Sequence, residues 1–427
     1  MPLPLHNMLT LRYSTTSLSD GIPVLVVPNA TTDVVRMDLV ADGGKYSRPN
    51  PLHALLTTRM LREGTPQHSA RDIADTLDWH GAWLELSVSH FHSYVTLYAL
   101  GRCFASTCQL VSELVATPTF PDERLRTVVE NNRRQFLVAR QKGNVIALRH
   151  LTTALYGPGH PLARAVDESD YDAVTRQQLV DTWQALFSHP SRLSIVLSGN
   201  VTPDVLSNVE SCFGTLPQDP YAPRVPNADT RTILSTPCHP ADGATFDQPL
   251  RVSRDRAQAS ISIGCLVMPV DDDDYPAFRL LNTVLGGYFG SRLMQSVREE
   301  GGYTYGISSD LAPGNMHTTF TISCECRSDS VDIVLDEVRR QLQRLIDEPV
   351  GDDELQRVRN YSIGELCRTY EGIFAKADAL VYLRNYGLPA THLDRCFDAV
   401  RTTTPQQLQS LAARYLRPDA MKVVVVE

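Results

Sequence analysis

The pattern of apolar and polar positions in the second half of the chain predicts both strands and helices. Residues 259–265 and 319–324 alternate between apolar and polar side chains, as half-buried strands do. Residues 331–346 instead carry apolar side chains at helical spacing, which predicts an amphipathic helix, and residues 103–115 show a similar stripe in the first half. Because strands are grouped apart from helices, we expect an α+β fold with antiparallel or mixed sheets.

The chain also repeats itself at long period. Tyr-Gly, Asp-Ala-Val and Gln-Gln-Leu motifs occur in the same order in both halves. They begin at Tyr156, Asp172 and Gln177, and again at Tyr386, Asp398 and Gln406. The small differences in spacing are those that insertions in surface loops produce. The repeat predicts two homologous domains, each a sheet packed with helices.

A proline-rich stretch separates the two copies. It contains Pro217, Pro220, Pro223 and Pro226 without apolar periodicity, which is typical of an extended connector. We therefore place an N-terminal domain at residues 1–213, a linker at 214–232 and a C-terminal domain at 233–427.

Composition narrows the classes of protein that the chain can represent. With 427 residues, 42% of them hydrophobic, the chain is long and apolar enough to fold as more than one domain. Its formal net charge of −9 disfavours binding to nucleic acid. We find no apolar run of membrane-spanning length and no signal peptide pattern. Nine cysteines without C-x-x-C spacing are typical of reduced thiols, so we expect a cytoplasmic protein.

Residues 51–65 predict an early helix that ends at Gly64, with the ending Met60-Leu61-Arg62-Glu63-Gly64-Thr65. With the duplicated halves and the proline-rich connector, this stretch resembles the pitrilysin/insulinase family of zinc peptidases, which includes the mitochondrial processing peptidase. The resemblance implies two homologous domains in a clamshell arrangement. In that family an H-x-x-E-H motif precedes the same ending.

The resemblance places the two metal-binding histidines at Leu55 and Arg59 and the glutamate base at Thr58. None of these side chains can do that work, because leucine has no lone pair and threonine is not a base. Arg59 would place a fixed positive charge beside the metal, and such a charge about 4 Å from a divalent ion costs roughly 8 kcal/mol at an effective dielectric constant of about 20. The third ligand would fall near Arg134 or Gln135. We expect no metal in this chain, and we interpret His53 as a partly exposed polar residue.

A second stretch, residues 286–306, resembles the family's second-half signature of a glycine loop, Ser-Arg-Leu, a helix ending in Arg-Glu, and a tyrosine. The resemblance implies that Arg298 and Tyr305 hold substrate carbonyl groups and support the transition state. It also implies substrate binding by four residues of the loop, Gly286, Gly287, Ser291 and Arg292. The competing interpretation pairs Arg298 with an adjacent glutamate on a solvated face and packs Tyr305 on a sheet.

Other clusters of histidine, cysteine or charged residues give weaker indications of a functional site. His90 with His92, and Cys324 with Cys326, each share a strand face, and we interpret both pairs as structural. Residues 271–274 are four aspartates before a predicted helix and are typical of a helix cap. Residues 121–150 are rich in Lys and Arg, which we interpret as a solvated helix face.

The leading hypothesis is a non-zinc subunit that completes the active site of a zinc-bearing homologous partner, acts on peptides and binds no zinc itself. A catalytically inactive homodimer that serves as a scaffold or peptide-binding protein is the alternative. An autonomous hydrolase ranks last, because the chain has neither a G-x-S-x-G nor an H-E-x-x-H motif.

Overall fold

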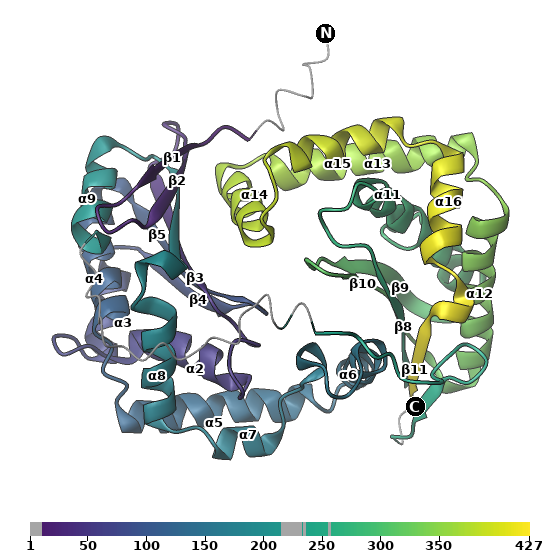
Figure 1. Ribbon diagram of the computed structural model, residues 1–427, viewed down its shortest axis with the longest axis horizontal. Helices are drawn as coiled ribbons and strands as arrows, with labels where there is room; N and C mark the ends of the chain where they lie inside the picture. Colours follow the sequence, from purple (N-terminus) through teal and green to yellow (C-terminus); the bar gives the residue numbers. More distant parts are fainter. Residues whose placement is uncertain (1–10, 215–232, 234–235, 255–257) are drawn as a thin grey trace, which may run out of the picture.

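The computed structural model describes residues 11–214, 233, 236–254 and 258–427. Two mixed sheets lie side by side with most of the helices on their outer sides (Figure 1). The α+β fold with two homologous domains is therefore confirmed. None of the helices in the described ranges is long and apolar enough to cross a bilayer. The expected linker lies almost wholly outside the described residues.

The first sheet has the strand order β1-β2-β6-β3-β5-β4. All its neighbours are antiparallel except β2 and β6, which run parallel. Its strands are β1 (Ser14–Ser17), β2 (Pro23–Pro28), β3 (Val34–Asp42), β4 (Trp83–Val88), β5 (His92–Leu100) and β6 (Leu193–Gly199).

The second sheet has the order β7-β11-β8-β10-β9, with β11 and β7 parallel. Its strands are β7 (Leu250–Val252), β8 (Gln258–Val267), β9 (Thr304–Ala312), β10 (Thr318–Arg327) and β11 (Lys422–Val426). The strands expected from alternation at residues 259–265 and 319–324 are thus present in β8 and β10.

Each half of the chain contributes its own set of helices. Those of the first half are α2 (Leu52–Met60), α3 (Ala70–Trp79), α4 (Phe104–Ala116), α5 (Asp122–Ala139), α6 (Gly143–Tyr156), α7 (Glu168–Asp172), α8 (Arg176–Phe187) and α9 (Pro203–Phe213). Those of the second half are α11 (Tyr275–Leu285), α12 (Val331–Asp347), α13 (Asp352–Tyr370), α14 (Ile373–Tyr386), α15 (Thr391–Thr402) and α16 (Pro405–Tyr415). Both apolar stripes read from the sequence lie on helices, α12 and α4, whose buried faces form part of the two main cores.

Two helices are exchanged between the halves. Helix α6 of the first half packs on β8 and β11 of the second sheet, and α14 of the second half packs on β6 and β2 of the first (Figure 1). The two helices have equal length and occupy equivalent places in the repeat, and each ends at a glycine with positive φ, Gly157 or Gly387. The structural units therefore cross the domain boundary that the sequence suggested.

Burial alternates along β10, which confirms the half-buried strand expected at residues 319–324, but the exchange of helices corrects the same expectation for residues 259–265. In β8 both faces are buried, because α6 covers the face that carries Ser260, Ser262 and Gly264. A Cβ atom at Gly264 would lie 3.2 Å from Leu151 of α6 and 2.5 Å from the carbonyl oxygen of Phe320. Small side chains on this face let the helix approach closely.

Candidate functional site

Helix α2 presents one accessible face. Seven of its nine residues are buried, and the other two are Leu55 and Arg59. The buried side packs on α8, β4 and α5. The Asn50 side chain accepts a hydrogen bond from the backbone N–H of Leu52 at 2.9 Å, which forms a turn that leads into the helix. The accessible face is therefore the face on which the sequence resemblance places the two missing histidines.

The groups on and beside this face do not fit a zinc ion. Leu55 offers no donor atom, and Thr58 is fully buried with its hydroxyl oxygen unpartnered. Arg59 adds a fixed positive charge. His53 is buried rather than partly exposed, and burial together with Arg48 lowers its pKa. Within the described ranges, no three His, Cys, Asp or Glu side chains are grouped as metal ligands would be.

The position of the expected third ligand lacks a carboxylate as well. Arg134 and Gln135 lie exposed on α5, and the Arg134 guanidinium pairs with Glu130 at 2.9 Å. Closer to α2, Tyr171 of α7 lies within electrostatic reach of Arg59 and donates a hydrogen bond to the carbonyl oxygen of Asn132 at 3.4 Å. The side chains at the expected ligand positions are therefore neutral or cationic, and the nearby acid Glu130 is paired with Arg134.

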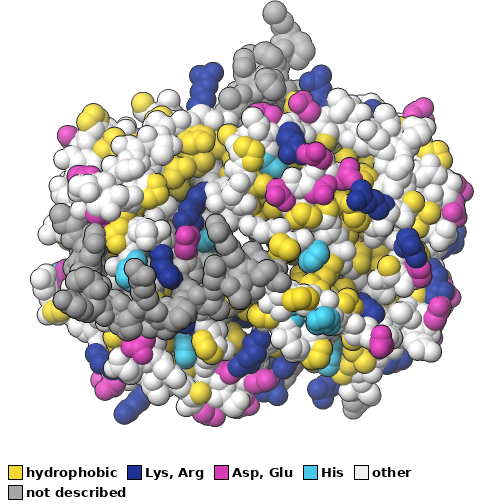
Figure 2. Space-filling model, viewed as in Figure 1, with side chains coloured by type: hydrophobic (Ala, Val, Ile, Leu, Met, Phe, Trp, Pro, Cys, Tyr) yellow, Lys and Arg dark blue, Asp and Glu magenta, His cyan; other side chains and the backbone are white. Residues whose placement is uncertain are grey.

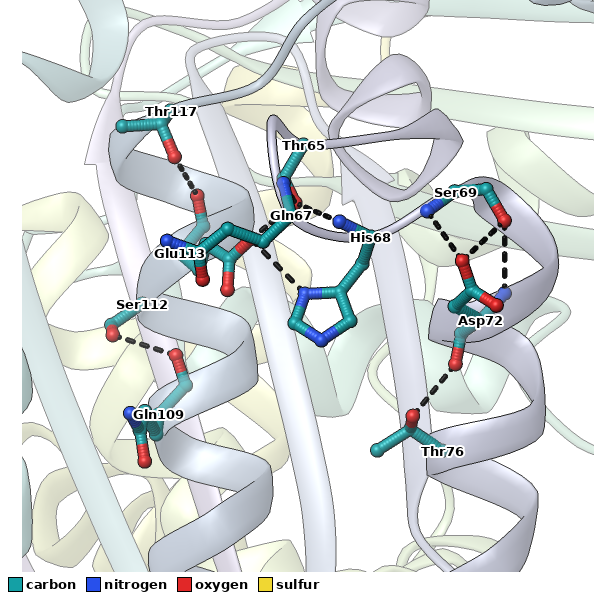
Figure 3. A network of polar contacts seen from close by, with 10 residues as sticks. All are labelled: Thr65, Gln67, His68, Ser69, Asp72, Thr76, Gln109, Ser112, Glu113 and Thr117. Carbon is teal, nitrogen blue, oxygen red and sulfur yellow. Dashed lines mark hydrogen bonds and ion pairs between the residues drawn. The ribbon is translucent and has the colours of Figure 1, made fainter.

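The ending that the sequence retains after α2 has a structural role. A 3-10 turn (Leu61–Glu63) leads to Gly64, whose φ of 150° is strained for other residues. The next residue, Thr65, donates a hydrogen bond to the Glu113 carboxylate of α4, and its hydroxyl oxygen accepts one from the backbone N–H of His68 at 3.0 Å (Figure 3). The His68 ring nitrogen Nδ1 lies 3.1 Å from the same carboxylate. This network ties the end of the helix segment to α4.

The glycine loop of the second half is tightly packed. A Cβ atom at Gly286 would lie 2.6 Å from Ser309 Oγ, and one at Gly287 would lie 2.8 Å from Thr283 Cα. Ser291 is buried and its hydroxyl has no partner. Arg292 donates two hydrogen bonds of 2.8 Å to Glu354 of α13, one to each oxygen. Substrate binding by these four residues stays a prediction, and the structure gives the two glycines and Arg292 a packing role.

Arg298 lies on a π-helix, η5 (Met294–Glu300), a type of segment that occurs often at functional sites. The backbone N–H of Gly301 donates a hydrogen bond to the carbonyl oxygen of Ser296, five residues earlier, which is the spacing of a π-helix. The guanidinium of Arg298 is one third exposed and lies 3.6 Å from Glu299. It also lies over the ring of Phe289, 4.7 Å from the centroid. The sequence interpretation missed Phe289, although an aromatic residue beside Gly290 in an exposed loop was a usable signal.

Tyr305 lies at the start of β9, an edge strand, inside a β-bulge. Thr304 pairs with Cys326 and Ile307 pairs with Cys324, so that Tyr305 and Gly306 together lie opposite one residue of β10. The Thr304 hydroxyl accepts a hydrogen bond from the backbone N–H of Gly306 at 3.0 Å, which stabilises the bulge. Bulges redirect side chains at strand ends. The Tyr305 side chain is consequently 90% exposed.

Arg298 and Tyr305 lie on neighbouring elements, since β9 packs directly against η5. In the described part of the chain no hydrogen bond joins their side chains, so the structure does not show the phenol turned back onto the guanidinium. The competing interpretation expects the contact between Arg298 and Glu299 that the structure shows, and substrate binding by Arg298 stays a prediction. That interpretation fails for Tyr305, which is not packed on the sheet.

The four aspartates before α11 do not cap it through their side chains. Asp274 is the N-cap residue but makes no capping bond, and it pairs with Arg414 at 3.1 Å. Asp273 likewise pairs with Arg395 at 2.7 Å. The acids therefore lie at the N-terminus of α11, where they offset its dipole as expected, and Asp272 accepts a hydrogen bond from the backbone N–H of Asp274 at 2.8 Å. A side-chain capping bond from Asp274 itself is not formed, because its carboxylate pairs with an arginine of α16.

The remaining clusters have structural surroundings. The His90 ring contacts the Tyr46 ring in a tilted arrangement with centroids 5.2 Å apart, and His92 Nε2 lies 3.7 Å from the Asp42 carboxylate. All nine cysteines are free thiols. Several arginines of residues 121–150 pair with nearby acids, and on the face seen in Figure 2 side chains of both signs are mixed.

Comparison with known proteins matches residues 173–361 to a family model described as the peptidase M16 inactive domain. An uncharacterised zinc protease of Mycobacterium bovis is 27% identical over 258 residues, which cover 59% of this chain and 56% of that protein. The chain thus spans little more than half the length of this relative. A protein of Helicobacter pylori named a non-peptidase homologue is 23% identical over 354 residues, covering 81% of this chain and 78% of that one.

Among solved structures, the peptidase M16 inactive domain from Pseudomonas fluorescens superposes with a TM-score of 0.84 at 24% identity. The match covers 97% of this chain and 98% of that one. At this identity the likeness shows the fold. Together with the family model, it confirms the resemblance drawn from the two sequence signatures.

Proposed function

Because this chain is an M16-type peptidase homologue whose helix α2 lacks the metal-binding side chains, we propose that it is the non-zinc subunit of a two-chain peptidase. In this proposal it associates in the cytoplasm with a homologous subunit that carries the zinc ion. It supplies Arg298 and Tyr305 to peptides bound between the two. The observation that carries the proposal is the asymmetry between a first half without ligands and a second half with an accessible arginine and tyrosine.

The side chains of this chain would act on the substrate in distinct ways. The guanidinium of Arg298 is planar and can donate two hydrogen bonds to peptide carbonyl oxygens. The phenol of Tyr305 is exposed and makes no hydrogen bond to any residue that the structure describes, so it can donate to the oxygen that becomes negative as the peptide carbonyl is attacked. Neither group needs a metal on this chain.

The edge strands suggest how a peptide would be held. Strand β9 lies at the edge of the second sheet and β4 at the edge of the first. An edge strand has unpaired backbone N–H and C=O groups that can pair with an extended peptide. Pairing at β9 would place peptide backbone next to Tyr305, with little dependence on its sequence.

A catalytically inactive scaffold is the second candidate. The contacts that favour it are those of Arg298, which already has Glu299 and Phe289 as neighbours. A substrate would have to compete with both. The related protein of Helicobacter pylori is named a non-peptidase homologue, which is compatible with a member of this fold that has no peptidase activity.

Reconstitution separates the two candidates. The chain is purified with its native partner, the subunits are separated, and the metal content of each is measured. Hydrolysis of an unstructured fluorogenic peptide is then followed with each subunit alone and with the mixture. We expect hydrolysis by the mixture and none by this chain alone, even with added zinc. Zinc-dependent turnover by the pure chain would refute the proposal, and a mixture no faster than the partner alone would support the scaffold.

A further inference from the structure

The accessible face of α2 carries a cation without a counter-ion. Within the described ranges, the Arg59 side chain makes no hydrogen bond and no ion pair, although it is half-buried. Burial lowers the pKa of Arg59, the neighbouring cation Arg62 lowers it further, and Tyr171 acts in the opposite direction. A half-buried guanidinium beside another cation lacks compensation that most buried charges have.

Other charges around this face are already matched. Glu63 pairs with Arg124 at 2.6 Å, and Arg133 pairs with Asp172. The dipole of α2 offsets a cation in its last turn, but only in part. Among the residues that the structure describes, Arg59 and its exposed neighbour Arg62 therefore remain without an ion-pair partner.

From this arrangement we propose that Arg59 forms a carboxylate-binding site on the face of α2 that in metal-bearing relatives would hold zinc. The guanidinium fork matches the two oxygens of a carboxylate, and a hydrogen bond between two charged groups is stronger than a neutral one. The ligand class is a peptide with an acidic group, either a glutamate or aspartate side chain or the C-terminal carboxylate. Leu55, one turn earlier on the same face, offers an apolar contact to the adjoining methylene groups.

This inference rests on the proposed function in one respect, that peptides are the molecules that reach α2. It adds a substrate preference that the edge strands alone do not provide. A preference for acidic peptides is not what the overall negative charge of the protein would produce. A chain with a formal net charge of −9 repels acidic peptides in general, so a preference for them requires a local site.

Chemical protection of Arg59 tests the site in the full-length chain. Phenylglyoxal modifies accessible guanidinium groups, and the modified positions are read by mass spectrometry of proteolytic fragments. Three peptides are compared that differ only at one internal position and at the C-terminus. The first has an internal glutamate and an amidated C-terminus. The second has glutamine and a free C-terminal carboxylate, and the third has glutamine and an amidated C-terminus. The first two arms distinguish a side-chain carboxylate from a terminal one.

We expect Arg59 to react in the free chain and to be protected by at least one of the two peptides that carry a carboxylate. The rate of modification should fall about tenfold at saturation, since a charge-assisted hydrogen bond is strong enough to give that preference. The third peptide should not protect. Arg71, which is exposed, should react in all arms, and Arg292, held by Glu354, should react slowly in all.

A variant gives the second readout. Arg59→Gln should remove the preference for the acidic peptide in fluorescence anisotropy, whereas Arg71→Gln, which removes one exposed positive charge elsewhere, should retain it. Unaltered modification of Arg59 with every peptide, absence of peptide binding, or a preference that survives in Arg59→Gln would each overturn the inference. Both measurements use the isolated chain, so their failure is distinguishable from a failure of reconstitution with the partner.

Discussion

Because helices are exchanged between the halves, a substitution at Leu380 should lower the stability of the opposite half by an amount that can be estimated. This side chain lies on α14 in the second half, is 2% exposed, and packs with Val27 and Val196 of the first sheet. Replacing a buried leucine by alanine removes its burial energy and leaves a cavity, which together cost about 2–5 kcal/mol. Because the cavity opens against the first sheet, Leu380→Ala should destabilise the first half although the substitution is in the second.

The tryptophans provide the assay. Trp79, Trp83 and Trp183 are the three in the chain, and all lie in the first half. Trp183 is partly buried and donates a hydrogen bond to the carbonyl oxygen of Val115 at 2.7 Å, so its fluorescence reports unfolding of that half. With a urea m-value of about 3 kcal/mol per molar, a loss of about 3 kcal/mol lowers the fluorescence midpoint by about 1 M.

A matched control and a second probe complete the experiment. Ile333→Ala lies on α12 of the same half but at a site that is 48% exposed, and it should change stability by about 0.5 kcal/mol or less. Far-UV circular dichroism follows both halves. A fluorescence midpoint unchanged in Leu380→Ala, with a shifted dichroism transition, would show that α14 does not stabilise the first sheet and would refute the reasoning.

Three further predictions concern single side chains. Tyr305→Phe should leave the urea midpoint unchanged, because the side chain is 90% exposed and its hydroxyl binds none of the described residues. It should nevertheless lower kcat of the reconstituted pair by roughly 10²-fold, the loss expected for one oxyanion donor, and an unchanged kcat would remove Tyr305 from the mechanism. A hydrogen bond from Cys108 lowers the pKa of Cys212 to about 7, so Cys212 should be the first thiol to react with an aromatic disulfide near neutral pH, and Cys212→Ser should abolish that fast phase. Burial, together with Arg279, lowers the pKa of His392 from 6.5 to about 4. As the pH falls, the unfolded chain therefore binds a proton at this histidine before the folded chain does. The free energy of unfolding should consequently decrease by an amount on the order of 3 kcal/mol as the pH falls from 6.5 towards 4. Urea midpoints across this range should fall less steeply in His392→Gln, and equal slopes would contradict the assignment.

Much of the site could be read from the sequence, because its features are local. Loss of zinc ligands follows from the identities of Leu55, Thr58 and Arg59 on one helix, and the structure places that helix as expected. Side-chain surroundings could not be read this way. The bidentate bond between Arg292 and Glu354 and the exposure of Tyr305 depend on elements that meet only in the folded chain.

By itself, the sequence determined the duplication, the strands at residues 259–265 and 319–324 and the helices with clear apolar stripes, since repeated motifs and hydrophobic periodicity are local features. Only the tertiary structure decided which sheet each element covers. Helices α6 and α14 have the same periodicity whether they pack on their own sheet or on the other. Their placement depends on close approach across the halves, as between Leu151 and Gly264, and on pairs such as Arg36 with Asp378 at 2.6 Å. Such contacts join residues far apart in the chain, and no local pattern records them.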